Sequence, residues 1–212
     1  MALGLIALVC RSGGEYGPIH ANWLLDQKKL SFDGFVLSDF PEDQINATVI
    51  PFSHNFPGWW SKMELFRPDL PQCPILYIDL DTVVKRIPDR FFDSPQSLML
   101  RDLYNEHKSA SGLMLIRPED RKIVWDAFIA DPNGIMARHP GGDQDFIRSV
   151  LPHNRFQTVF PEDKIFSYKA HFSPERGKKH YIGGGDINEA RFVCFHGKPR
   201  PWEVKEEWIQ II

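Results

Sequence analysis

The sequence contains few cysteines and no long hydrophobic segment. Its 212 residues include three cysteines, Cys10, Cys73 and Cys194, which lie far apart and form no C-x-x-C pair. This spacing argues against a disulfide framework and predicts free thiols in a reducing compartment, so we expect a cytoplasmic protein. The apolar run at residues 3–10 is shorter than the roughly 20 residues of a membrane-spanning helix and lacks the basic start and cleavage site of a secretion signal. It predicts a buried strand and no transmembrane segment.

An excess of basic charge is also missing. The formal net charge is -3, and no block of like charge occurs, which argues against a nucleic-acid partner. The basic residues between 176 and 180 are interpreted as a solvated loop. The chain has no internal repeat and no low-complexity linker, and its 42% hydrophobic content is enough for one sizeable core. We therefore expect residues 1–212 to form a single domain.

Apolar runs alternate with helical patterns along the first half of the chain. Such alternation predicts an α/β fold with a mixed, mainly parallel central sheet flanked by helices. Strands are expected at 3–10, 32–39, 47–52, 73–81, 97–102 and 109–116, and helices at 18–30, 57–70, 121–130 and from Asp143. Two late segments, 158–169 and 190–197, are expected to be extended. Because ligands bind outside the carboxyl ends of parallel strands, the motifs "RSGG", "DLD" and "HGK" are expected to meet along one edge.

Two carboxylates, Asp79 and Asp81, end the apolar strand predicted over residues 73–81. In an extended chain, residues i and i+2 point to the same face, so both acids would project together while Leu80 turns away. Adjacent carboxylates repel, and a divalent cation such as Mn²⁺ or Mg²⁺ would neutralise them with the hard oxygen ligands that it prefers. The alternative is that one acid starts a turn and the other is solvated.

Two enzyme families place a D-x-D motif directly after a buried strand. The stretch "DLDTV" at residues 79–83 matches the first motif of the haloacid-dehalogenase-like phosphatases, which would make Asp79 a nucleophile. In that family the motif stands on the opening strand of the domain, whereas several predicted strands precede it here.

A second resemblance covers nearly the whole chain. The sequence resembles the metal-dependent nucleotide-sugar glycosyltransferases of GT-A fold, in particular the retaining group of glycogenin and the bacterial lipooligosaccharide galactosyltransferases, with their small phage and bacterial relatives. The matching stretches, in order, are "LVCRSGGEY", "WWSKMELF", "YIDLDTVV", "SASGLMLI", "GGDQDF" and "CFHGKPRPWE". Two departures occur. Ala110 stands where the family has an Asn, and His196 and Lys198 are closer together than in the family's closing motif, which leaves Lys198 or Arg200 for the phosphate.

The resemblance implies a site and a reaction. The donor would be UDP-glucose or UDP-galactose, the acceptor is unspecified, with a saccharide as one candidate, and the transferred hexose would retain its anomeric configuration. The metal, Mn²⁺ or Mg²⁺, would bind Asp79, Asp81 and His196, and the catalytic residues would be Asp143, Gln144 and Lys198. The donor would contact Ser12, Tyr16, Lys62, Leu80, Asp102, Ser111 and Gly197.

Each assignment has a structural alternative. Tyr16 could stack on the base or pack against the helix that carries Trp23. Lys62 could instead be an exposed helix position, and Asp143 a helix N-cap. Trp59 is interpreted as core or lid packing rather than a direct sugar contact. A third possibility for the whole protein is a non-catalytic nucleotide-sugar or carbohydrate-binding module.

Overall fold

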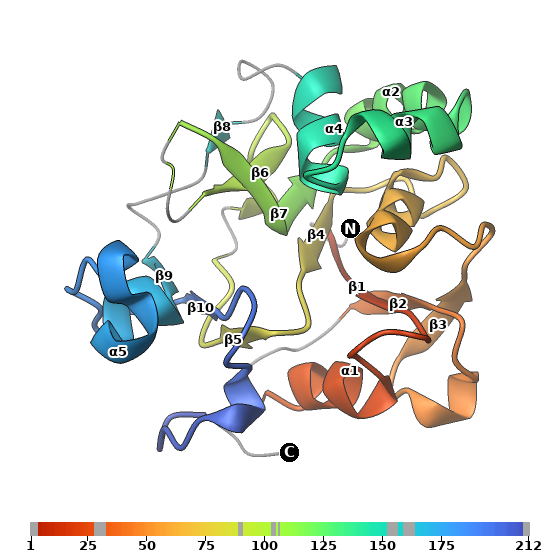
Figure 1. Cartoon of the computed structure of the whole chain (residues 1–212). Coiled ribbons are helices and arrows are strands. Elements are labelled where there is room, and N and C mark those ends of the chain that lie inside the picture. The colour runs from red at the N-terminus through yellow and green to blue at the C-terminus, as the bar shows by residue number, and fades with distance from the viewer. Residues whose placement is uncertain are drawn as a thin grey trace.

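A mixed seven-stranded sheet forms the centre of the molecule (Figure 1). The computed structural model describes residues 4–27, 33–88, 91–102, 105, 107–151, 157–158 and 164–209. The strand order is β3-β2-β1-β4-β7-β6-β8. The bounds are β1 Leu5–Cys10, β2 Gly34–Ser38, β3 Thr48–Pro51, β4 Ile75–Ile78, β6 Leu98–Arg101, β7 Ser109–Ile116 and β8 Gln157–Thr158. Strands β3, β2, β1 and β4 pair in parallel, and β7 runs antiparallel to both β4 and β6. The expected α/β class with a mixed central sheet is confirmed.

The sheet separates two apolar cores, and β1 contributes to both. Ile6, Leu8 and Cys10 face one core, and Ala7 and Val9 face the other. This is the two-residue alternation of a strand that is buried on both faces, which explains the continuous apolar run in the sequence.

Helices cover the two faces of the sheet, as Figure 1 shows. Helix α1 (Pro18–Leu25) packs on the first core. The second core is covered by a succession of 3-10 turns, η2 (Gly58–Phe66), and by helices α2 (Pro118–Ile129), α3 (Pro132–Arg138) and α4 (Asp143–Val150).

A second, smaller sheet adjoins the first core. Its strands are β5 (Thr82–Val84), β10 (Phe192–Cys194) and β9 (Ile165–Ser167), in the order β5-β10-β9. The chain passes from the central sheet to this sheet through Asp79–Asp81. The predicted extended conformation over these residues is wrong, because β4 ends at Ile78 and the amide of Thr82 donates to the carbonyl of Asp79 at 3.1 Å, which closes a tight turn.

Most predicted elements lie within a few residues of their expected bounds. The helix predicted over 18–30 ends at Leu25, and residues 28–30 lie outside the described part of the chain. The helix predicted over 57–70 is the 3-10 segment η2. Helix α3 was not predicted, although Asp131 caps it by accepting from the Gly134 amide at 3.0 Å and Pro132 opens it.

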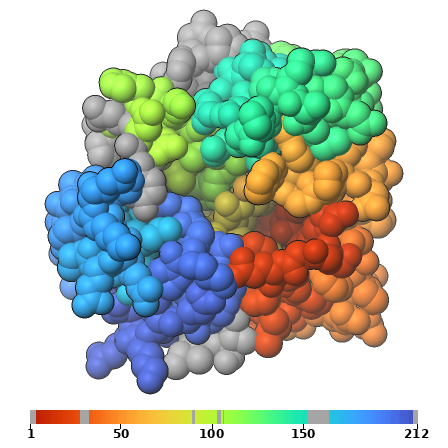
Figure 2. All heavy atoms as spheres, in the orientation of Figure 1, coloured from red at the N-terminus to blue at the C-terminus, as the bar shows by residue number. Residues whose placement is uncertain are grey.

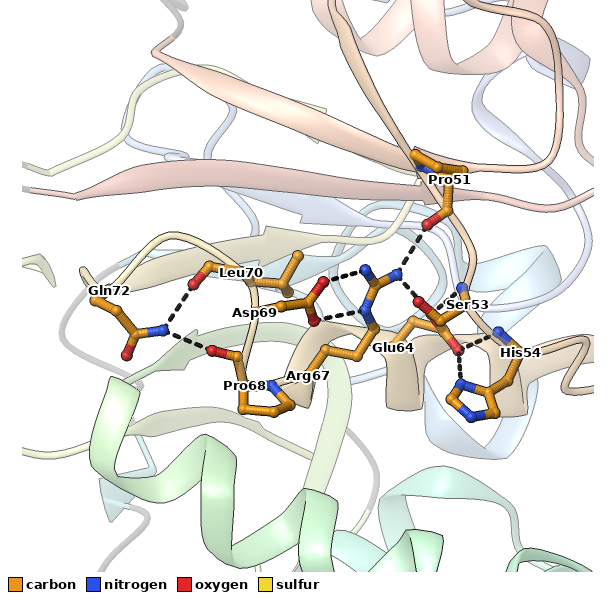
Figure 3. A network of polar contacts seen from close by, with 9 residues as sticks. All are labelled: Pro51, Ser53, His54, Glu64, Arg67, Pro68, Asp69, Leu70 and Gln72. Atoms are coloured by element: carbon orange, nitrogen blue, oxygen red, sulfur yellow. Dashed lines mark hydrogen bonds and ion pairs between the residues drawn. The ribbon is translucent and has the colours of Figure 1, made fainter.

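A buried carboxylate, Glu64, fixes η2 to the loop that follows β3 (Figure 3). Its two oxygens accept from the amides of Ser53 at 2.8 Å and His54 at 3.0 Å. Arg67 pairs with Glu64 at 3.0 Å and donates to the carbonyl of Pro51 at 2.8 Å. The network is nearly closed to solvent and sets the position of η2, which carries Lys62.

In the described part of the chain, no helix is long and apolar enough to cross a membrane.

Replacing Glu64 with Ala should lower the free energy of unfolding by about 3 kcal/mol, because it leaves the buried Arg67 and two loop amides without their acceptor. Chemical denaturation of the variant measures this loss. The matched control is Asp69→Ala, which removes a largely exposed carboxylate (62% of the side chain is exposed) from the same arginine and should cost about 1 kcal/mol or less. Equal losses in the two variants would show that the buried network is not what holds η2.

Candidate active site

Two adjoining cavities lie at the carboxyl ends of β1 and β4. The first lobe, about 400 Å³, is bordered by residues 11–16 after β1 and by Gly197 and Arg200. The second lobe, about 420 Å³, is bordered by β7, the start of α4 and Asp102. Figure 2 shows the hollow on this face, between the red N-terminal segment and the blue C-terminal segment. The residues that line both lobes are Trp59, Lys62, Asp79, Asp81 and His196. The acidic turn therefore lies where the two lobes meet.

Asp79 is held by a lysine and a tyrosine. Lys62 Nζ lies 2.9 Å from Asp79 Oδ1, and the hydroxyl of Tyr77 donates to the same oxygen. Burial disfavours the charge of Lys62, but the carboxylates of Asp79 and Asp143 outweigh this effect and raise its pKa. Lys62 is therefore a largely buried, charged group at the junction of the lobes, and its interpretation as an exposed helix position is wrong.

Asp81 is the more buried of the two acids and is held by Arg200. Its side chain is only 8% exposed and forms a short ion pair with the guanidinium. Burial, reinforced by the negative charge of Asp79, raises the pKa of Asp81 to about 6. Arg200 also bonds Glu15, with Nη2 2.6 Å from Oε2, and lies over the ring of Tyr16 at 5.0 Å.

The acidic turn offers two hard oxygen donors to a divalent cation. Both carboxylates face the same space, and the repulsion between them would be relieved by a cation. Among the described residues, no group of three His, Cys, Asp or Glu side chains is arranged to hold a metal ion. The residues therefore fit a divalent cation as a two-carboxylate site with open positions for a ligand.

His196 lies beside this turn but bonds elsewhere. Its Nε2 is 2.8 Å from the hydroxyl oxygen of Ser167. Burial, followed by the positive charge of Lys169, lowers the pKa of His196 to about 4. The ring is therefore neutral at pH 7, the protonation state that metal ligation requires.

The second lobe presents Asp143 and Gln144 at the start of α4. The N-cap position belongs to Gly142, so Asp143 is not the predicted cap. Asp143 is buried, and burial raises its pKa. Its Oδ2 has no hydrogen-bond partner among the described residues, so it can accept from a ligand hydroxyl. Gly142 has φ +89°, and a Cβ there would meet the indole nitrogen of Trp59 at 2.6 Å, so glycine permits the close approach of the two segments.

In the first lobe, the turn after β1 is held in place by Asp39, the residue that follows β2. The Ser12 amide and hydroxyl donate to Asp39 at 2.7 and 2.5 Å. Tyr16 lines the lobe and also packs edge-on against His20 and Trp202, with centroids 5.8 and 6.1 Å apart. Packing of Tyr16 on α1 is therefore confirmed, and its stacking on a nucleotide base stays a prediction.

No protein-family model matches the chain, and no curated protein sequence matches it. Solved structures do match. The glycosyltransferase GlyE of Streptococcus pneumoniae TIGR4 aligns over 93% of this chain and 55% of its own, with TM-score 0.66 and 13% identity. The galactosyltransferase LgtC, solved with donor and acceptor sugar analogs, aligns over 93% and 88%, with TM-score 0.61 and 12% identity.

The chain has a glycosyltransferase fold. Mouse xyloside xylosyltransferase 1 supports the same conclusion, with TM-score 0.53, 11% identity and coverage of 91% of this chain and 97% of its own. The chain spans about half the length of GlyE. The expected GT-A-type architecture is thereby confirmed, and at these identities the likeness concerns the fold alone.

On this glycosyltransferase fold, the structure brings together all the predicted site residues except Lys198. The residues that line one or both lobes are Ser12, Tyr16, Lys62, Asp79, Leu80, Asp81, Asp102, Ser111, Asp143, Gln144, His196 and Gly197. Lys198 lines neither lobe. Its side chain is 62% exposed, and its ammonium pairs with Glu15 and Glu203 at 2.5 Å each.

Two residues that line the lobes, Arg200 and Trp59, were not the preferred site residues on the sequence pattern. Arg200 takes the wall position in the first lobe that the sequence favours for Lys198. Trp59, interpreted as core or lid packing, is 59% exposed and lines both lobes, whereas its neighbour Trp60 is in the core. The adjacent glycine Gly58, with φ +53°, was the local signal that the chain turns there.

Replacing Arg200 with Met should destabilise the protein more at pH 7 than at pH 4. The pKa of Asp81 is about 6 in the native state and roughly 3.9 in the unfolded state. The free energy of unfolding therefore falls as the pH rises through 6 and native Asp81 ionises. The positive charge of Arg200 offsets part of this loss. Arg200, together with Lys198, also lowers the pKa of Glu15 to about 2. That stabilisation is complete above the unfolded pKa of Glu15 and decreases as the pH falls toward 2, so both effects have the same sign, although the Glu15 effect changes less between pH 7 and pH 4. The expected loss is about 2 kcal/mol at pH 7.

Chemical denaturation at the two pH values measures this difference. The control is Lys122→Met, which removes an exposed cation paired with Asp126 and should change stability little at either pH. A loss in Arg200→Met that is the same at both pH values would show that Arg200 acts by packing on Tyr16 rather than by its charge.

Proposed function

We propose that the protein is a glycosyltransferase that transfers a hexose from UDP-glucose or UDP-galactose to an acceptor, a saccharide being the class we expect. The observation that carries this proposal is the pair of lobes that meet at the acidic turn. The first lobe, with Tyr16 and the turn after β1, would take the nucleoside, and the second lobe would take the sugar. The diphosphate between them would lie beside the acidic turn and the cations Lys62 and Arg200.

Asp79 and Asp81 are proposed to hold Mn²⁺ or Mg²⁺. Such an ion, when bound, supplies positive charge that stabilises the departing diphosphate. Arg200 would have to share or release Asp81 for the ion to bind. His196 would become a third ligand either through Nδ1, with Nε2 kept on Ser167, or through Nε2 after release from Ser167. Lys62 is already in place to balance negative charge at the junction of the lobes.

The second lobe is proposed to orient the hexose. The free Oδ2 of Asp143 would accept from a sugar hydroxyl, and Gln144 and Asp102 would supply further polar contacts. Retention of configuration is proposed from the resemblance to the retaining group. It would result if the acceptor attacks the sugar on the same face from which the diphosphate leaves.

The comparisons support transfer over the alternatives. The matching structures are glycosyltransferases by name, and none of those cited is a phosphatase. In addition, Asp79 is bonded by both Lys62 and Tyr77, which leaves it less available as the nucleophile of a phosphatase. A non-catalytic binding protein would share the lobes, and turnover separates it from an enzyme.

Thermal stabilisation by UDP, with and without Mn²⁺, tests the donor site, because a ligand that binds the native state raises its stability by mass action. We expect a rise in Tm that requires both UDP and Mn²⁺ and that is lost in Asp81→Ala. Asp126→Ala, which removes an exposed carboxylate from α2, is the control and should behave as wild type. A response to UDP that persists in Asp81→Ala would contradict the metal assignment.

Release of UDP from UDP-glucose and UDP-galactose tests catalysis. We expect slow metal-dependent hydrolysis of one of them in the absence of acceptor, lowered at least about tenfold in Asp143→Asn, since an amide in place of a carboxylate removes an acceptor for a sugar hydroxyl. Binding without turnover in any acceptor mixture would identify a binding protein instead. Hydrolysis of simple phosphoesters that disappears in Asp79→Asn would identify a phosphatase.

A further inference from the structure

Lys169 brings an unassigned positive charge next to Gly197, a residue that lines the first lobe. It lies on the short turn Tyr168–Phe172 that follows β9, and it is half-buried. Its Nζ is 3.5 Å from the point that a Cβ on Gly197 would occupy. Gly197 lines the first lobe and has no side chain, so the ammonium lies directly behind a lining residue that cannot shield it with a side chain.

Among the residues that the structure describes, Lys169 has no ion pair or hydrogen bond through its ammonium, unlike the other cations nearby. Lys62 is paired with Asp79, and Arg200 with Asp81 and Glu15. Lys198 is paired with Glu15 and Glu203. A partly buried ammonium that is not engaged in an ion pair is available to an anionic ligand without breaking an existing contact.

The ammonium of Lys169 interacts electrostatically with charged residues around the acidic turn. Burial, followed by the charge of Arg200, lowers the pKa of Lys169, whereas Asp81 opposes that effect. The charge of Lys169 in turn contributes to the low pKa of His196. Lys169 therefore adds positive charge to the side of the first lobe on which Gly197, Asp81, Arg200 and His196 lie, where the diphosphate is proposed to bind.

We propose that Lys169 is the cation that binds the terminal phosphate of the nucleoside diphosphate. This phosphate carries the sugar in the donor and leaves with the nucleoside diphosphate when the bond to the sugar breaks. This inference rests on the proposed function. Lys198, which the sequence favours for this role, would have to break two ion pairs and swing in from an exposed position. Lys169 has no such pair to break, and Gly197, which has no side chain, leaves space between its ammonium and the lobe.

Binding of UDP and of uridine, each measured by calorimetry in the presence of Mn²⁺, tests the assignment. Uridine lacks both phosphates, so the ratio of the two affinities reports the contribution of the diphosphate. We expect Lys169→Met to lower this ratio about tenfold or more while leaving the affinity for uridine unchanged, and Lys169→Arg to restore part of it. Lys179→Met, which removes an exposed cation of the same C-terminal region, is the control and should leave the ratio at the wild-type value.

The outcomes separate this inference from the proposed function. If wild type binds neither UDP nor uridine, the proposed function is wrong and the inference with it. If wild type binds UDP more tightly than uridine and Lys169→Met keeps the ratio, only the role of Lys169 is overturned. If Lys198→Met lowers the ratio of the UDP and uridine affinities more than Lys169→Met does, Lys198 is the residue that binds the phosphate and the inference is overturned. An equal loss of both ligands in Lys169→Met, with a lowered Tm of the free protein, overturns the inference in favour of a structural role.

Discussion

The repulsion between Asp79 and Asp81 is the constraint on which the arrangement of the site depends. Two carboxylates in one tight, largely buried turn cannot both stay ionised without positive charge beside them. The chain supplies it from two distant segments, Lys62 on η2 and Arg200 near the C-terminus. Each of these segments is then held in turn, η2 by the buried Glu64 and the C-terminal segment by Glu15. The cavity walls are therefore set by the requirement to neutralise one turn.

The contact between the two ends of the chain belongs to the same arrangement. Arg200 and Glu15 are 185 positions apart in sequence, yet they share a two-bonded ion pair at the rim of the first lobe. Next to it, Trp202 packs against Trp23 and His20 of α1, with centroids 5.5 and 4.4 Å apart. Aromatic packing and ion pairing together close the first lobe, so its shape depends on residues that no short motif contains.

The sequence was informative wherever a strong local pattern coincided with a strand end. The apolar runs predicted β1, β2, β4 and β7, and the strand-end rule correctly predicted that the glycine turn and the acidic turn meet. His196 and Gly197 of the "HGK" segment join them from the second sheet, whereas Lys198 does not. The predictions that were wrong concern features that depend on tertiary contacts. The turn at Asp79 arises because β5 pairs with β10 in a different sheet. Lys198 and Arg200, two residues apart, differ in position because Lys198 pairs with Glu15 and Glu203, whereas Arg200 also pairs with the buried Asp81. The position of Lys169 is seen only from its approach to Gly197 in the folded chain.

The crossing of the chain from one sheet to the other at the acidic turn has a consequence for how the protein is made. During synthesis the N-terminal strands β1 to β4 emerge early and have all their parallel partners at once. Strand β5 follows directly, but its partner is β10, with Val83 opposite Val193, and Arg200 lies further on still. On the ribosome Asp81 therefore remains without its arginine until a further 119 positions have been added, whereas Asp79 emerges after its own partner Lys62.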